Sequence, residues 1–181
     1  MSSPLWYFAY GANTSTRVLD RRGIAPLSSE AARLDGWRFA FSMRGFPGVE
    51  PAFANIEPDA ASCVHGVLHR MRASDLERLD RVEGFGYRHR DVEVVGIRSG
   101  SVTATAYACP RTVNGALPSR RYLSLVCDGA REHGLPQSWI AALEAQPRRH
   151  VPLLSDLVNS SMKTLEGARR LLLRGTRRGR R

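Results

Sequence analysis

The 181-residue sequence lacks several features that would place it in other classes of protein. It has no stretch approaching the roughly 18 consecutive apolar residues needed to cross a bilayer, so no membrane-spanning helix is predicted. A secretion signal has a basic segment before its apolar run, and the short N-terminal apolar run of this sequence has none. Hydrophobic residues make up 43% of the chain and charged residues 24%, which is typical of a folded globular protein. These observations predict a globular protein located in the cytoplasm.

Cysteine is scarce, and the residues that bind metals are not clustered. Cys63, Cys109 and Cys127 are far apart and form no CxxC pair, which argues against a zinc site and a disulfide framework. His65 and His69 lie four residues apart in a predicted strand without a carboxylate partner, so ordinary strand histidines are expected. Nucleotide-binding glycine motifs and a nucleophile-elbow serine are also missing. We therefore predict neither a metal nor a cofactor.

Acidic residues are fewer than basic ones, 17 against 27, which gives a formal net charge of +10. The excess is concentrated in the last thirteen residues, Arg169–Arg181, which include seven arginines and no acid. A basic end of this kind can bind nucleic acid or an acidic partner. More often it is a solvated terminus, and this one has no aromatic residue that could stack on bases. Nucleic-acid binding is therefore not expected, although the tail leaves it open.

Short strands dominate the first two thirds of the chain. Alternating and β-branched patterns predict strands over 5–10, 31–43 (a strand or hairpin), 52–56, 63–71, 91–97 and 101–109. Glycine and proline predict a loop over 44–51. Helical spacing and end signals predict helices over about 16–22, 74–83, 119–133 and 136–144, with a further amphipathic helix within 151–173. This is an α+β pattern rather than a regular βαβ repeat.

The first predicted strand ends in the sequence Tyr10-Gly11-Ala12-Asn13, which is followed by three hydroxyl residues. A strand that passes through a glycine-containing turn into a helix points several backbone N–H groups in one direction, and these suit an anion such as a carboxylate. Gly11 permits the close approach of a ligand, and Asn13 can cap a helix. On spacing alone, a capped turn without a ligand is the simpler interpretation.

A second candidate lies at the end of the helix predicted over 74–83. Glu83 occupies the last turn, near the negative end of the helix dipole, and Asp80 adds a like charge one turn earlier. Both effects disfavour ionisation, so we expect the pKa of Glu83 to be raised. Such an acid suits proton transfer, although a surface carboxylate without a function explains the pattern too.

Four segments occur in a characteristic order: YFAYGAN (7–13), VHGVLHRM (64–71), LDRVEGFGYRHRDVEV (79–94) and SRRYLSLVCDGAREHGLP (119–136). Together they resemble the gamma-glutamylcyclotransferase family over roughly residues 5–145. Within that family they resemble the gamma-glutamylcyclotransferase branch itself rather than the gamma-glutamylamine cyclotransferases or the glutathione-specific branch. The resemblance implies a small mixed β-barrel with flanking helices. It predicts a catalytic domain over residues 1–147, followed over 148–181 by a helical extension with the arginine-rich tail.

The resemblance also implies an activity, the release of 5-oxoproline from a gamma-glutamyl compound without a metal or cofactor. Glu83 would be the catalytic acid/base. Backbone amides of the first loop would bind the glutamyl carboxylate, and the substrate-binding residues would be Phe8, Ala9, Tyr10, Gly11, Ala12, Asn13, Tyr87 and Tyr122. The family loop usually has serine where this chain has Ala12. A contact made by the backbone N–H survives that change, and one made by the hydroxyl is lost.

Two functions stay open at this point. The first is an enzyme acting on a gamma-glutamyl amino acid, peptide or amine, including a gamma-glutamyl group that protects a biosynthetic intermediate. The second is a catalytically silent module that binds such a compound and docks through its basic tail on nucleic acid or an acidic protein. Glu83 favours the enzyme, whereas Ala12 leaves the second open. A small-molecule substrate, no membrane, and a monomer or homodimer are expected in either case.

Overall fold

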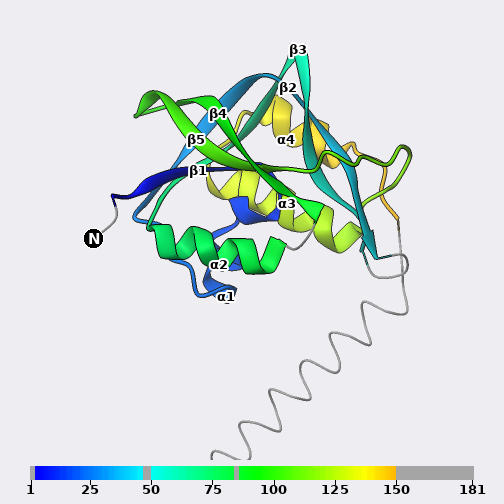
Figure 1. Ribbon diagram of the computed structural model, residues 1–181. Coiled ribbons are helices and arrows are strands. Elements are labelled where there is room, and N and C mark those ends of the chain that lie inside the picture. The colour runs from blue at the N-terminus through cyan, green and yellow to red at the C-terminus, as the bar shows by residue number, and fades with distance from the viewer. Residues whose placement is uncertain (1–2, 47–49, 84–85, 150–181) are drawn as a thin grey trace, which may run out of the picture. The chain divides into compact units, whose positions relative to one another are not determined.

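The computed structural model describes residues 3–46, 50–83 and 86–149 (Figure 1). Its elements follow in the order β1 (Leu5–Ala9), the 3-10 turn η1 (Ala12–Thr14), α1 (Thr16–Arg21), β2 (Ser28–Phe46), β3 (Glu50–Met71), α2 (Ala73–Glu83), β4 (Arg88–Gly96), β5 (Gly100–Ala108), α3 (Arg120–Glu132) and α4 (Gln137–Glu144). Within these ranges no helix has the length and apolar character needed to cross a membrane. The helix predicted within 151–173 and the arginine-rich tail lie outside the described residues, so the extension over 148–181 stays a prediction.

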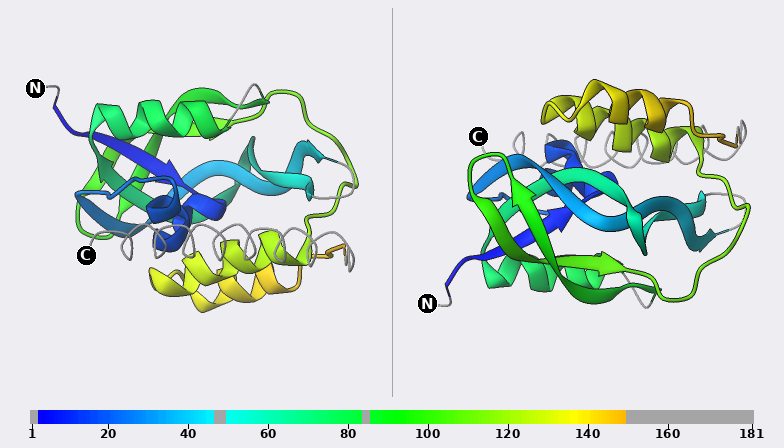
Figure 2. Two further views of the ribbon diagram at one scale, coloured as in Figure 1. Left: turned by 90° about the horizontal axis from the view of Figure 1, so that it is seen from below. Right: turned by 90° about the horizontal axis from the view of Figure 1, so that it is seen from above.

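The five strands form a closed barrel in the order β1-β3-β2-β4-β5. Neighbouring strands are antiparallel except at the closure, where β1 runs parallel to β5 with Tyr7 opposite Thr105. Figure 2 shows α2 on one side of the barrel and the α3–α4 pair on the opposite side, with β1 and α1 between them. The mixed barrel with flanking helices predicted from the sequence is confirmed.

The hairpin of β2 and β3 is longer than predicted. The strands expected over 52–56 and 63–71 are parts of one 22-residue strand, and most of the loop expected over 44–51 belongs to β2 or β3. Pro58 lies within this strand, opposite Trp37, just where the pairing register shifts after Asp35. A proline, which has no N–H, is tolerated at such an irregularity. The strand therefore continues through it.

Several shorter elements were predicted correctly because their end signals are local. Gly100 has a φ of +70° in the turn between β4 and β5, a conformation that favours glycine. The side chain of Ser119 accepts a hydrogen bond from the Tyr122 N–H and caps α3. At its other end, α3 is followed by Gly134 with a φ of +64°. These signals define the β4–β5 hairpin and α3 without help from the rest of the fold.

The buried residues form two clusters, and β1 belongs to both. Phe8 packs with the residues of the larger cluster, whereas Tyr7 and Ala9 pack with Leu19 and Leu79 of α1 and α2 in the smaller one. Successive side chains of a strand point to opposite faces, so β1 is buried on both faces. The loop that follows β1 therefore begins from a fixed position between the two clusters.

Candidate active site

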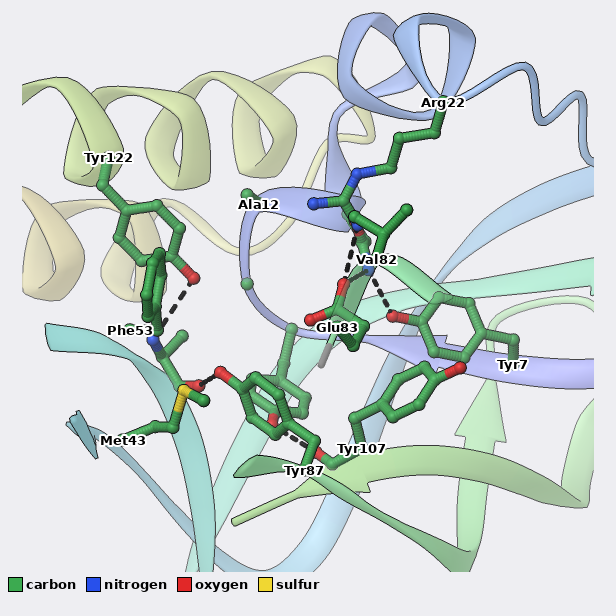
Figure 3. A pocket seen from close by; sticks show the side chains of 14 residues that line it. Tyr7, Ala12, Arg22, Met43, Phe53, Val82, Glu83, Tyr87, Tyr107 and Tyr122 are labelled. Atoms are coloured by element: carbon green, nitrogen blue, oxygen red, sulfur yellow. Dashed lines mark hydrogen bonds and ion pairs between the residues drawn. The ribbon is translucent and has the colours of Figure 1, made fainter. Parts of the chain in front are cut away.

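The loop after β1 and the end of α2 meet at a pocket with a volume of about 180 Å³ (Figure 3). Seven of the nine predicted site residues line it: Tyr10, Gly11, Ala12, Asn13, Glu83, Tyr87 and Tyr122. The lining also includes seven residues that the sequence did not indicate: Tyr7, Arg22, Met43, Phe53, Ala54, Val82 and Tyr107. Segments far apart in the sequence are thus brought together at one place.

Phe8 and Ala9 were predicted to bind substrate, but neither lines the pocket. Phe8 is fully buried in the larger cluster and Ala9 is 1% exposed in the smaller one. The pattern YFAYGAN runs continuously through the strand and the loop, and the prediction did not separate the two. Their side chains hold the strand in place, so we leave both residues out of the site.

Glu83 is fixed by two neighbours that act on the same oxygen. Nη1 of Arg22 donates to Glu83 Oε1 at 2.7 Å, and Nδ2 of Asn13 donates to that oxygen at 2.9 Å. Arg22 also reaches Asn13 Oδ1 at 2.7 Å, which closes a three-membered network. The side chains of Arg22 and Glu83 are only 23% and 16% exposed. Glu83 Oε2 takes part in no hydrogen bond with a described residue, and Figure 3 shows it turned away from Arg22.

The charge environment of Glu83 differs from the one considered in the sequence. Asp80, which was treated as a like charge acting on Glu83, has partners of its own, His89 Nε2 and the Tyr107 hydroxyl, both at 2.6 Å from its Oδ1. Arg22 was not among the predicted site residues. It lies at the C-terminal end of α1, 61 residues from Glu83 in the sequence, and no local pattern connects the two.

The loop does more than cap a helix. The 3-10 turn begins inside it, with the N–H groups of Thr14 and Ser15 donating to the carbonyls of Gly11 and Ala12 at 3.1 Å. Ser15, not Asn13, precedes α1, and the side chain of Asn13 points to Glu83 instead. Among the described residues, no hydrogen bond is donated by the N–H groups of Gly11 and Asn13. Such groups suit an anion at the pocket wall.

Gly11 stands where a side chain would collide with its neighbours. A Cβ built there would lie 3.1 Å from both Ala54 Cβ and the hydroxyl oxygen of Tyr122. This spacing is tighter than ordinary van der Waals contact, so glycine lets the loop approach β3 and α3 closely. The close approach brings the loop backbone to the pocket wall.

His69 supports the loop from beneath. Its Nε2 lies 3.1 Å from the Asn13 carbonyl oxygen and its Nδ1 lies 2.8 Å from Ser29 Oγ. A carbonyl can only accept, so the proton is assigned to Nε2, and Nδ1 accepts from the Ser29 hydroxyl. Burial lowers the pKa of His69 to about 4, which keeps the ring neutral near pH 7. The sequence predicted an ordinary strand histidine and gave no sign of this contact.

All five tyrosines of the chain line this pocket. Burial raises the pKa of each phenol, so all five are neutral hydrogen-bonding groups at physiological pH. The Tyr87 hydroxyl donates to the Ala54 carbonyl at 2.5 Å, and Tyr122 Oη accepts from the Ala54 N–H at 3.2 Å. Tyr122 therefore keeps its own hydrogen for another acceptor.

The described residues include no group of three or more His, Cys, Asp or Glu side chains arranged to hold a metal ion. Cys63, Cys109 and Cys127 are free thiols and lie outside the pocket lining. The chemistry that the pocket itself supports is acid–base chemistry at Glu83, next to oriented N–H and O–H donors.

Comparison with known proteins points to one family. The model of the AIG2-like family matches residues 63–143. A Mus musculus protein named gamma-glutamylcyclotransferase is 29% identical over 168 residues, which cover 87% of each chain. A solved structure titled gamma-glutamyl cyclotransferase has a TM-score of 0.71 at 25% identity and covers 87% of this chain and 99% of its own. Over most of its length the chain is similar to gamma-glutamylcyclotransferases.

The chain also matches fungal proteins that are longer than it is. The gamma-glutamyl cyclotransferase gliK of Aspergillus fumigatus is 30% identical over 157 residues, which cover 71% of this chain and 57% of that protein. The chain spans 57–64% of the length of the first fungal gamma-glutamyl cyclotransferases that it matches. These similarities confirm the resemblance found in the sequence and agree with the barrel fold.

Proposed function

We propose that this protein is a gamma-glutamylcyclotransferase, which releases 5-oxoproline from a gamma-glutamyl amino acid, peptide or amine. The observation that carries the proposal is the Glu83 carboxylate, whose Oε1 is held by Arg22 and Asn13 while Oε2 takes no hydrogen bond from a described residue. This oxygen is placed to exchange a proton with a bound compound. The names of the relatives support the same activity.

The reaction needs a proton to be moved twice. The α-amine of a gamma-glutamyl group is protonated near pH 7, so it must lose a proton before it can attack its own γ-carbonyl. Glu83 takes that proton as a general base and then returns one to the departing amine as a general acid. A carbon–nitrogen bond forms to close the five-membered ring, and the bond to the leaving amine breaks. No water is consumed and no covalent enzyme intermediate is required.

The pocket supplies the remaining requirements. The N–H groups of Gly11 and Asn13 are donors for the glutamyl α-carboxylate. Binding of this carboxylate keeps the α-amine near the γ-carbonyl. Holding the two reacting groups close together lowers the entropic part of the activation barrier to ring closure. The hydrogen of the Tyr122 hydroxyl is available for a substrate oxygen on which negative charge develops. Ala12 has no side-chain donor, so we assign its contribution to the backbone.

Release of 5-oxoproline by Glu83→Gln and wild-type protein tests the proposal. The amide preserves the shape of the side chain but cannot act as a base, so we expect kcat to fall about 10²–10⁴-fold. Glu77→Gln is the matched control, because Glu77 is an exposed carboxylate on the same helix and should leave kcat unchanged. Equal thermal unfolding midpoints would show that both variants fold.

Two results would contradict the proposal. One is a Glu83→Gln variant as active as the wild type. The other is a wild-type protein that releases no 5-oxoproline from gamma-glutamyl amino acids, gamma-glutamyl amines or glutathione. Binding of these compounds without turnover would favour the silent binding module instead.

A further inference from the structure

The pocket has a polar side and an apolar side. Figure 3 shows Arg22 and Tyr7 on one side of Glu83, and Met43, Phe53 and Tyr122 on the other. Arg22 and Glu83 are the charged residues of the lining, and they pair with each other. We call Met43, Phe53 and the ring of Tyr122 the apolar wall.

The apolar wall is built by packing between three elements. Met43 and Phe53 are cross-strand partners in β2 and β3. The Phe53 ring meets the Tyr122 ring of α3 edge to face, with centroids 5.2 Å apart. The Met43 methyl group covers Gly86, where a Cβ would lie 2.3 Å from Met43 Cε. The wall is therefore held in position and is not formed by loose surface side chains.

Burial shows which way a substrate must point. Tyr7, Tyr10 and Tyr107 are buried and form the floor, whereas Met43 and Phe53 are half-buried at the edge. On the polar side, the network of Arg22, Asn13 and Glu83 closes the pocket. A glutamyl group held at Glu83 in about 180 Å³ leaves the rest of the compound to extend past the half-buried edge.

We propose that the apolar wall is the subsite for the leaving amine, and that the preferred substrates are gamma-glutamyl compounds whose amine carries an aliphatic or aromatic group. This inference rests on the proposed function. Methionine adapts its shape to different apolar partners, so the wall suits a class of side chains and not one compound. It offers no cation to an acidic side chain and no carboxylate to a basic one.

A series of dipeptides that differ only in the leaving amino acid tests the inference. We would measure kcat/KM for gamma-glutamyl-glycine, -leucine, -phenylalanine and -glutamate by 5-oxoproline release. Leucine and phenylalanine should exceed glycine by about tenfold, the scale set by apolar contacts in a specificity pocket, and glutamate should fall below glycine. The free carboxylate is common to all four compounds, so the side chain is the only variable.

Met43→Gln tests whether the wall is responsible, because glutamine has a similar length but a polar end. We expect the leucine-to-glycine ratio of kcat/KM to fall from about tenfold toward one. Leu27→Gln is the matched control: Leu27 is an apolar residue that is 48% exposed and lies outside the pocket lining, so this variant should keep the wild-type ratio.

The outcomes separate this inference from the proposed function. Release of 5-oxoproline at similar rates from all four dipeptides, or fastest from gamma-glutamyl-glutamate, would overturn the apolar subsite and leave the proposed function standing. A folded Met43→Gln variant with the wild-type ratio would overturn the role of the wall. No release from any compound would overturn the proposed function and this inference with it.

Discussion

Replacing Arg22 with methionine would remove the central member of the network around Glu83. Methionine keeps much of the length of the side chain but has no donor, so both Glu83 Oε1 and Asn13 Oδ1 lose a partner at 2.7 Å. A hydrogen bond to a charged group contributes about 1.5–3 kcal/mol, and both side chains of the ion pair are less than one quarter exposed. A loss of about 2–3 kcal/mol in transition-state stabilisation corresponds to a fall in kcat/KM of about 30- to 150-fold.

The measurement is steady-state 5-oxoproline release, with thermal unfolding of each variant as the test of folding. Arg22→Lys keeps the positive charge but not the fork of donors, so its kcat/KM should lie between those of the wild type and Arg22→Met. Arg21→Met is the control, because Arg21 is the neighbouring exposed arginine of α1. An Arg22→Met variant within about threefold of the wild type would refute the reasoning, and an equal loss in Arg21→Met would assign the effect to the helix instead of to the contacts.

Three further predictions concern the support of the loop. The pKa of His69 is about 4 in the folded protein and about 6.5 when exposed, so the unfolded chain binds the proton first as the pH falls. About 3 kcal/mol of the free energy of unfolding should therefore be lost between pH 6.5 and pH 4. A His69→Phe variant with the same pH dependence in denaturant unfolding would contradict this. Gly129→Ala would place a Cβ 2.2 Å from Thr14 Oγ1, and the overpacking should lower the free energy of unfolding by about 1–3 kcal/mol. An unchanged midpoint of urea unfolding would contradict this. Tyr7→Phe removes one of the two acceptors of Asn13 Nδ2 and should reduce kcat/KM about two- to tenfold. Full activity of this variant would show that Asn13 needs no such support.

The parts of the fold that the sequence predicted well are those with local signals. The β4–β5 hairpin follows from strand patterns on either side of Gly100, and α3 follows from its capping serine and Gly134. The β2–β3 hairpin was not predicted in full: strands were expected only over 52–56 and 63–71, and Pro58 lies between them within β3. What keeps the strand continuous is its pairing with Trp37 at a register shift, a contact between residues 21 positions apart.

The site divides in a similar way. Glu83 and the loop from Tyr10 to Asn13 were selected because a short motif marks each of them. Arg22 and His69 were not, since each acts through one contact with a distant residue that only the closed barrel creates.

Because every tyrosine of the chain lies at one pocket, the spectroscopic signals of tyrosine report on that pocket. None of the three tryptophans lines this pocket, so phenol and indole signals come from different places. Changes in tyrosine ring resonances or in near-ultraviolet tyrosine absorption on adding a ligand would be attributable to this pocket without any introduced dye. Reagents that modify phenols would likewise mark its occupancy, and protection by a bound compound would be visible in a single mass spectrum of the intact chain.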